Sequence, residues 1–203
     1  MSSAIITFIK NPELGKVKTR LAKDIGDQHA LEVYKNLMKH TRLTLEKVEQ
    51  VDRLLFYSEN IVVEDEWSEE LFKKFLQDPG DLGKRIEAAF SIAFDIGYKK
   101  VMIIGSDCPE ISADLINEGL SRLEKVDMVV GPALDGGYYL LGLKSAPAQF
   151  FEDIPWSTEK VLELTLKKAD LEELRVFRLK ELSDLDFASD LAKYPFLIKN
   201  LSK

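Results

Sequence analysis

A continuous apolar run, Val101–Gly105, constrains the fold more than any other feature of this 203-residue chain. A strand that is apolar on both faces is typical of the centre of a parallel sheet, because helices then cover both faces. Shorter runs predict further strands at residues 4–9, 53–58, 128–131, 138–143 and 174–179. Strands that alternate with helical segments predict an α/β fold, with a Rossmann-like, mostly parallel central sheet flanked by helices.

Apolar spacing and capping residues place the helices. The spacing predicts helices at residues 28–48 and 64–75, and a third from about Ile86 that Gly97 ends. Ser112 and Ser157 are expected to cap helices that run to about residues 123 and 169, and residues 187–200 are expected to be helical. Because no repeat, low-complexity tract or linker interrupts this order, we expect one domain over residues 1–203.

The distribution of charge narrows the classes of partner. A net charge of −7 argues against a nucleic-acid partner. Residues 10–23 nevertheless hold five basic side chains and one acid, a balance of +4, so the other residues carry −11. A small positive focus in an acidic protein suits a small anionic ligand, although a solvated basic loop would have the same composition.

Two classes of site are excluded by composition. The only cysteine is Cys108, so the chain has neither an internal disulfide framework nor a cysteine-based zinc site. No apolar run approaches the ~18 residues that a membrane span needs. A reducing cytoplasm is therefore the expected compartment, and the sequence leaves the oligomeric state open.

The basic focus lies directly after the first predicted strand, in the loop from Lys10 to Arg20. Its candidate nucleotide-binding residues are Lys10, Pro12, Gly15, Lys18 and Arg20. Gly15 lets backbone amides approach a ligand, Lys18 supplies a point charge, and Arg20 supplies a planar fork for phosphate oxygens. The loop matches neither the Walker A pattern nor the GxGxxG fingerprint of dinucleotide-binding proteins. This placement after a strand favours a phosphate site.

A second loop, from Gln77 to Arg85, is a candidate for contacts with the base of a nucleotide. The candidate residues are Gln77, Gly80, Asp81, Leu82, Gly83 and Arg85. Two glycines bracket a turn that opens a helix, and backbone groups in such a turn can bind the edge of a base. The alternative is a plain junction in which Asp81 caps the helix.

Asp107 follows the central strand, in the sequence Gly105-Ser-Asp-Cys-Pro109. A carboxylate at the exit of such a strand suits Mg²⁺ or Mn²⁺ beside phosphates, because hard cations take oxygen ligands. The alternative is that Asp107 caps the turn that follows it. Cys108 is interpreted as a packed side chain rather than a nucleophile.

The acceptor side is expected at Asp135, Gly136, Gly137 and Tyr138, together with Trp156. Two glycines after an acid form a tight loop where a substrate can approach the backbone. Tyr138 or Tyr139 either stacks on a substrate ring or packs in the core, and the sequence leaves both roles open.

Four motifs in order resemble the nucleotide-diphospho-sugar transferase (GT-A-like) superfamily, and in particular a bacterial glycosyltransferase-like family. The resemblance covers nearly the whole chain and rests on Phe8–Ala22, Gly80–Arg85, Gly105–Pro109 and Asp135–Tyr138. It implies that Asp107 holds the metal. Residues 186–191 resemble the Asp-Thr-Pro-Glu-Asp-Leu segment of sugar-nucleotide synthetases, with Phe, Ala and Ser in place of Thr, Pro and Glu. That similarity implies that Asp186 is a second metal ligand.

Together these features predict a metal-dependent transferase with Lys18, Arg20 and Asp107 as its catalytic residues. It would bind a nucleoside triphosphate or a nucleotide-diphospho-sugar and transfer a nucleotidyl or glycosyl group to a small acceptor. The basic loop suits a departing pyrophosphate, whereas the resemblance favours glycosyl transfer. A non-catalytic nucleotide sensor of the same fold is the alternative. The missing dinucleotide fingerprint argues against an oxidoreductase.

Overall fold

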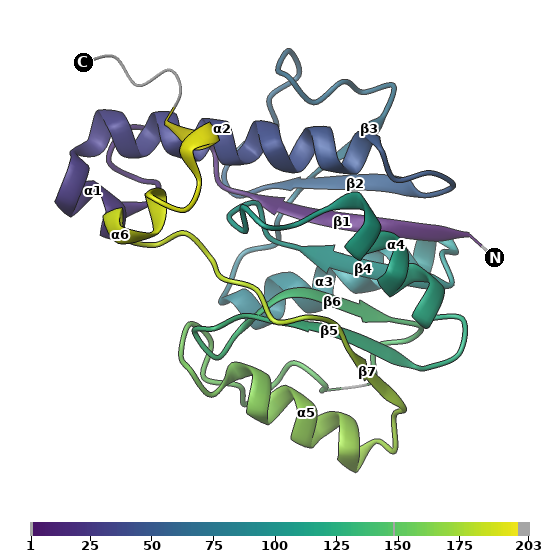
Figure 1. Ribbon diagram of the computed structural model, residues 1–203. Coiled ribbons are helices and arrows are strands. Elements are labelled where there is room, and N and C mark those ends of the chain that lie inside the picture. The colour runs from purple at the N-terminus through teal and green to yellow at the C-terminus, as the bar shows by residue number, and fades with distance from the viewer. Residues whose placement is uncertain (1, 148, 199–203) are drawn as a thin grey trace.

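A computed structural model describes residues 2–147 and 149–198 of the chain (Figure 1). The strands of this part are β1 (Ser3–Ile9), β2 (Asp52–Tyr57), β3 (Phe72–Leu76), β4 (Lys100–Ile104), β5 (Met128–Pro132), β6 (Tyr138–Leu143) and β7 (Val176–Arg178). The helices are α1 (Thr19–Ile25), α2 (Asp27–Glu46), α3 (Leu82–Ile96), α4 (Ala113–Arg122), α5 (Val161–Leu171) and α6 (Ala188–Leu191), with a 3₁₀ turn, η1, at Pro195–Leu197. None of the helices in this part is long and apolar enough to cross a membrane.

The strands of this part form one sheet in the order β3-β2-β1-β4-β6-β5-β7. β1 pairs in parallel with both β2 and β4, so the loops that follow these strands leave the same edge of the sheet. β6 runs antiparallel to β4 and β5, and β7 is parallel to β5. The prediction of a mostly parallel α/β sheet is therefore confirmed.

Helices cover both faces of the sheet. On one face, Leu45 of α2 and Ile116 of α4 pack in the same buried cluster as Ile5 and Met102. On the other face, Phe90 of α3 belongs to the cluster that contains strand residues of opposite parity, such as Ile6 and Val101. In Figure 1, α2 lies above the central strands and α5 below them, with α3 behind the sheet. Strand β4 is buried along its whole length, as its continuous apolar run predicted.

The predicted helix at residues 64–75 is wrong, because this segment ends in strand β3. Phe72 is buried, and its ring meets that of Trp67 edge-on at 4.9 Å between centroids. β3 pairs in parallel with β2 at the edge of the sheet. The buried ammonium of Lys74 binds the carbonyls of Val62 and Val63 at 2.8 and 2.9 Å. These non-local contacts outweigh the helical spacing of the apolar residues.

One predicted helix cap is confirmed, and three other helical segments differ from the sequence prediction. Ser112 caps α4 as expected, with Oγ accepting a hydrogen bond from the Leu115 amide. Ser157 does not cap α5, because its backbone is left-handed (φ 65°) and the helix begins at Val161. Helix α1 begins at Thr19, inside the predicted loop from Lys10 to Arg20, and continues to Ile25. The predicted helix at 187–200 is instead α6 followed by η1, and residues 199–200 lie outside the described residues.

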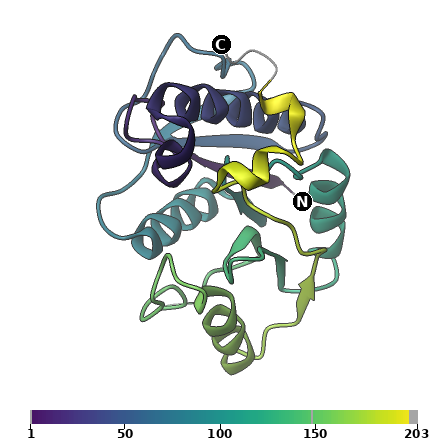
Figure 2. The same ribbon diagram turned by 60° about the vertical axis from the view of Figure 1, so that its left-hand side comes forward.

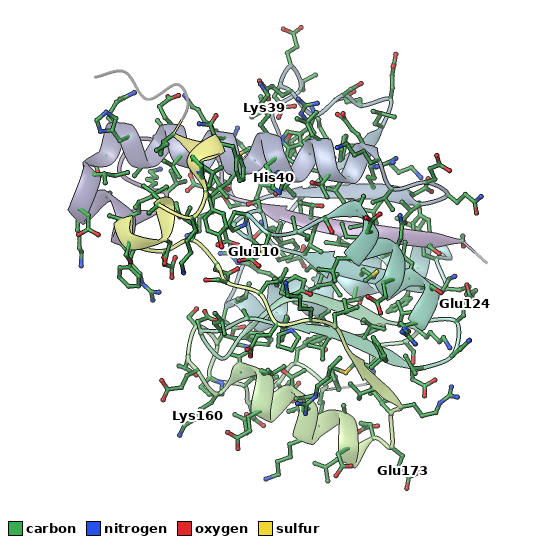
Figure 3. The ribbon with its side chains drawn as sticks, in the orientation of Figure 1. Lys39, His40, Glu110, Glu124, Lys160 and Glu173 are labelled. Atoms are coloured by element: carbon green, nitrogen blue, oxygen red, sulfur yellow. The ribbon has the colours of Figure 1, made fainter. Side chains whose placement is uncertain are left out.

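The segment 194–197 docks on α2 and on the loop after β4. The hydroxyl of Tyr194 donates to the Glu110 carboxylate (2.6 Å), and the Asn36 side-chain amide donates to the Leu197 carbonyl (2.8 Å). The His40 ring lies 5.2 Å from that of Phe196. Figure 3 labels His40 on α2 and Glu110 on the neighbouring loop. In Figure 2 the C-terminal segment is yellow, with η1 beside α2 and the preceding α6 beside α1. It therefore covers one side of the loop that follows β4.

Candidate functional site

The first and fourth strands deliver the central residues of the site. β1 ends at Ile9 and leads through the basic loop to α1, whose N-cap position is Lys18. β4 lies beside β1 and leads into the loop that carries Asp107. The Lys18 ammonium is 3.3 Å from Oδ2 of Asp107, so the structure brings the predicted phosphate loop and the predicted metal ligand together.

A third segment reaches the same place from the C-terminal part of the chain. The Lys18 ammonium donates to the Leu185 carbonyl at 2.7 Å and lies 3.7 Å from Oδ1 of Asp186. The Arg20 guanidinium binds Oδ2 of Asp186 at 2.7 Å. Lys18, Arg20, Asp107 and Asp186, which the sequence singled out separately, are therefore neighbours.

Lys18 is both enclosed and conformationally unusual. Its side chain is only 7% exposed, whereas those of Asp107 and Arg20 are 48% and 61% exposed. Its backbone is left-handed (φ 46°, ψ 45°), a region that costs a non-glycine residue about 1 kcal/mol. Backbone strain of this kind concentrates at functional sites, where the surrounding contacts maintain it.

Tyr34 of α2 holds the phosphate loop and the Asp107 loop together. Its hydroxyl oxygen accepts a hydrogen bond from the Lys10 amide (2.8 Å) and lies 3.1 Å from the Lys10 carbonyl and 3.3 Å from Oγ of Ser106. Burial raises the pKa of Tyr34 to about 12, so the hydroxyl stays protonated. The sequence indicated only an apolar helix face here, since tyrosine fits a core position equally well.

Asp184 is a further carboxylate of the site, one of three acids within residues 184–190, and the sequence assigned it no binding role. Burial is the main cause that raises the pKa of this carboxyl from 3.8 to about 7, and the negative charges of Asp107 and Asp135 add to it. The positive charge of Lys18 acts in the opposite direction. In the sequence, the only sign that Asp184 belongs to the site was its proximity to Asp186. The carboxyl of Asp184 thus shares one electrostatic environment with those of Asp107, Asp135 and Asp186 and with the Lys18 ammonium.

The predicted base-binding loop is held by its own polar side chains. Asp81 caps α3 by accepting a hydrogen bond from the Lys84 amide (3.0 Å). The Gln77 side-chain amide donates to the carbonyls of Ile9 and Phe56, and its oxygen accepts from Arg85. Gln77 therefore joins the ends of β1 and β2 to α3.

The other predicted nucleotide-binding residues line the loops. Arg85 also donates to the Gly80 carbonyl at 3.0 Å, which fixes the turn. Lys10, Pro12 and Gly15 are exposed on the phosphate loop, and Gly15 is left-handed with φ 75°. Leu82 is 40% exposed at the start of α3. These exposed groups are the part of the two loops that a ligand can contact.

Trp156 connects the predicted acceptor residues to the base-binding loop. A Cβ atom built on Gly83 would lie 2.2 Å from Nε1 of Trp156, so only glycine permits this approach. The ring of Tyr138 meets that of Trp156 edge-on at 6.5 Å between centroids. The Tyr138 hydroxyl is buried, with the Thr165 side chain beside it. Tyr139 is a core residue, with its hydroxyl donating to the Lys180 carbonyl at 2.9 Å.

The loop of Asp135, Gly136 and Gly137 packs against the start of α5. A Cβ atom on Gly136 (φ 86°) would lie 2.2 Å from the Glu159 carbonyl oxygen, and Asp135 accepts a hydrogen bond from the Gly137 amide at 2.9 Å. An open cavity of about 390 Å³ borders this loop, lined by Gly136, Glu159, Leu162, Glu163, Leu166 and Arg178. The predicted acceptor residues therefore form a continuous wall from α3 to α5.

The donor set around Lys18 fits a magnesium or manganese ion of the kind that binds with phosphates. Within the described ranges there is no group of three or more histidine, cysteine, aspartate or glutamate side chains arranged to hold a metal. Asp107 and Asp186 nevertheless place carboxylate oxygens within 4 Å of the same ammonium. Magnesium sites commonly use one or two carboxylates, with water and substrate phosphates as the other ligands.

Comparison with known families identifies the chain at the level of family. Residues 41–158 match the family described as "Uncharacterized protein conserved in bacteria (DUF2064)". The chain belongs to this family. A crystal structure of a provisionally assigned nucleotide-diphospho-sugar transferase from Desulfovibrio desulfuricans G20 is 33% identical to this DUF2064 protein. The match covers 100% of this chain and 90% of the Desulfovibrio chain, with a TM-score of 0.88. No curated protein matched the chain.

More distant solved structures share the fold of this DUF2064 protein. A CMP:2-keto-3-deoxy-manno-octonic acid synthetase in complex with CTP has a TM-score of 0.58 at 10% identity, over 98% of both chains. The 4-diphosphocytidyl-2C-methyl-D-erythritol synthase of Anaerococcus prevotii DSM 20548 has a TM-score of 0.60 at 9% identity, over 95% of this chain and 93% of its own. The fold is therefore that of the nucleotide-diphospho-sugar transferases, as the motifs predicted.

Proposed function

We propose that the protein is a metal-dependent transferase that binds a nucleoside triphosphate or a nucleotide-diphospho-sugar. It transfers a nucleotidyl or glycosyl group to a small acceptor. The observation that carries this proposal is the meeting of Lys18, Asp107 and Asp186 at the exits of β1 and β4. Ligands of open parallel sheets bind beyond the carboxyl ends of the strands, which is where these residues lie.

Each residue has a role that its geometry supports. Lys18 and Arg20 bind phosphate oxygens and neutralise the charge that develops on the departing group. Asp107 and Asp186 hold Mg²⁺ or Mn²⁺, which when bound shields and orients the phosphates. Such a transfer needs no nucleophilic side chain, since positioning and electrostatics supply the rate enhancement.

The remaining residues select the two substrates. The backbone of Gly80–Gly83, exposed at residues 80–82, binds the edge of the base. The side chains of Gln77 and Arg85 hold this loop in place. Asp135, Gly136, Gly137, Tyr138 and Trp156 form the acceptor wall. Because Trp156 touches Gly83, the nucleotide and the acceptor are bound by surfaces that are in direct contact.

Nucleotidyl transfer is the first of two chemistries that this scaffold supports. A basic loop around Lys18 and Arg20 suits pyrophosphate as the departing group. The two distant neighbours named above use, by their names, cytidine nucleotides. Glycosyl transfer is supported by the name of the relative from Desulfovibrio desulfuricans. The released products distinguish the two chemistries. Nucleotidyl transfer releases pyrophosphate, whereas glycosyl transfer from a nucleotide sugar releases a nucleoside diphosphate.

The first test is a thermal-shift screen of nucleoside triphosphates and nucleotide sugars, with and without Mg²⁺. A ligand at one hundred times its dissociation constant stabilises the folded state by about 2.7 kcal/mol, which is easily detected. Hits are then incubated with sugar phosphates and other small acceptors, and pyrophosphate and nucleoside diphosphate are measured. If no nucleotide shifts the midpoint at millimolar concentration, the proposal is wrong.

The non-catalytic sensor is the second candidate function, and the enzyme assay separates the two. A sensor binds nucleotide but forms neither product with any acceptor. Turnover that depends on metal and is lost in Asp107→Asn, with the fold retained, rules the sensor out.

A further inference from the structure

The Lys18 ammonium occupies the position in which two carboxylates could share a cation. Its oxygen neighbours are Oδ2 of Asp107 at 3.3 Å, Oδ1 of Asp186 at 3.7 Å and the Leu185 carbonyl at 2.7 Å. With 7% of the side chain exposed, the ammonium is covered by protein rather than water. All three neighbours are oxygen acceptors of the type that a hard divalent cation also binds.

The position between Asp107 and Asp186 does not accommodate both the Lys18 ammonium and a metal ion. A magnesium or manganese ion approaches its oxygen ligands to about 2.1 Å, well inside the distances that Lys18 keeps. An ion bound by both Asp107 and Asp186 would therefore lie within a few ångströms of the ammonium, where like charges repel strongly in a partly buried site. Lys18 must move before such an ion can use both carboxylates.

The Lys18 side chain is able to move without its backbone. The Lys18 carbonyl accepts a hydrogen bond from the Ala22 amide at 2.8 Å, which fixes the backbone at the start of α1. The side chain is a flexible four-carbon chain, and only its ammonium pairs with Asp107 and Asp186. Phosphate oxygens next to the carboxylates would offer the ammonium equally strong acceptors.

Building on the proposed function, we propose that Lys18 acts as a built-in cation that holds the metal position in the nucleotide-free protein. A divalent ion alone then binds weakly, because it must displace the ammonium. An ion that arrives together with a polyphosphate binds well, because the phosphate oxygens take over the ammonium. The substrate is thus the preformed complex of metal and nucleotide, rather than a free nucleotide that meets a metalloprotein.

The first experiment measures binding of Mn²⁺ alone from the loss of its free-ion electron paramagnetic resonance signal. Lys18→Met keeps the length of the side chain and removes the competing charge, so we expect Mn²⁺ to bind about tenfold or more tightly, within the usual range of coupling between two sites. Lys16→Met is the matched control, because Lys16 lies on the same loop as Lys18 but pairs with Glu13 and Glu59 rather than with Asp107 or Asp186. It should bind Mn²⁺ like the wild type.

The second experiment uses the unmodified protein and so does not depend on a variant that folds. The rate at which an amine-specific reagent labels each lysine is followed by mass spectrometry. In the protein alone, Lys18 should be labelled slowly. Saturating Mn²⁺ should make the labelling of Lys18 faster, and adding tripolyphosphate together with Mn²⁺ should make it slow again. Lys16, with a side chain that is 56% exposed, serves as the internal reference.

The inference is overturned if folded Lys18→Met binds Mn²⁺ no more tightly than the wild type. It is also overturned if saturating Mn²⁺ leaves the labelling of Lys18 unchanged relative to Lys16. Both measurements use only Mn²⁺ and an inorganic polyphosphate. A failure to find any transferase product would therefore reject the proposed function while leaving these two results to decide the role of Lys18.

Discussion

Asp184 should make the folded protein less stable as the pH rises from about 4 to about 7. The pKa of this carboxyl is raised to about 7 in the folded protein from 3.8 in the unfolded chain, chiefly by burial and then by Asp107 and Asp135. Between those two values the folded protein retains a proton that the unfolded chain has lost. Folding is therefore favoured at the acidic end of this window and disfavoured above it.

The size of the effect follows from the width of that window. Each unit of pKa difference corresponds to about 1.4 kcal/mol, so the full difference would cost about 4 kcal/mol above pH 7. Asp184 retains some contact with solvent, and we therefore expect about half of this value, roughly 2 kcal/mol. About one third of the cost is already present at pH 5, so the stability advantage of Asp184→Asn should grow by about 1 kcal/mol between pH 5 and pH 8.

The assay is urea unfolding of the wild type and Asp184→Asn at several pH values from 5 to 8, in a chelator that removes divalent metal. The difference in free energy of unfolding between the two proteins isolates this carboxyl from every other titrating group. Asp170→Asn, an exposed position on α5, controls for the loss of one negative charge. A difference that stays constant with pH, or a variant that is less stable than the wild type at pH 8, would refute the reasoning.

Four further substitutions test the site and its supports. Asp107→Asn should lower kcat/KM by about a hundredfold or more and abolish Mn²⁺ binding while the fold is retained, as circular dichroism will report. Tyr34→Phe keeps the ring but removes the hydroxyl between the two loops, so it should cost about 1–2 kcal/mol in urea unfolding and raise KM for nucleotide. Gly83→Ala forces a Cβ atom against Trp156 and should cost about 1–3 kcal/mol, with weaker nucleotide binding in the thermal-shift assay. Lys74→Met leaves two loop carbonyls without their donor and should cost about 1–3 kcal/mol without changing KM, and a normal unfolding midpoint would contradict that role.

The pairing of Lys18 with Asp107 could be predicted because it depends on a simple property of parallel sheets. Both residues follow strands with strong apolar patterns, and such strands place their exits at one edge. The base-binding loop and α3 were predicted from other signals, two glycines and an apolar stripe, since the strand before that loop, β3, was predicted as a helix. Where an apolar run in the sequence is followed by a glycine or an acid, the strand and loop predicted from the local sequence agree with the tertiary structure.

Segments whose structure depends on partners distant in the sequence were beyond this reasoning. Trp67, Leu71 and Phe75 lie four residues apart, which is the spacing of a helix face. Trp67 is buried, but so is Phe72, one residue out of that pattern, whereas Leu71 is 46% exposed. Pairing with β2 decides which face of the segment points inward. Tyr34 illustrates the converse, since its apolar ring satisfied the helical pattern and concealed the role of its hydroxyl.

The acidic part of the site shows most clearly what only the tertiary structure supplies. Arg20 and Asp186 are 166 residues apart in the sequence, and only the resemblance to known motifs connected them. Two contacts bring residues 182–186 to the site: a parallel bridge between Ala133 and Leu182, and a hydrogen bond from the Leu185 amide to the Asp107 carbonyl. These contacts bury Asp184 near the carboxylates of Asp107 and Asp135. Burial, with the neighbouring negative charges adding to it, raises the pKa of Asp184. A buried carboxyl among other acids is costly to ionise, and only the tertiary structure shows that Asp184 is such a group.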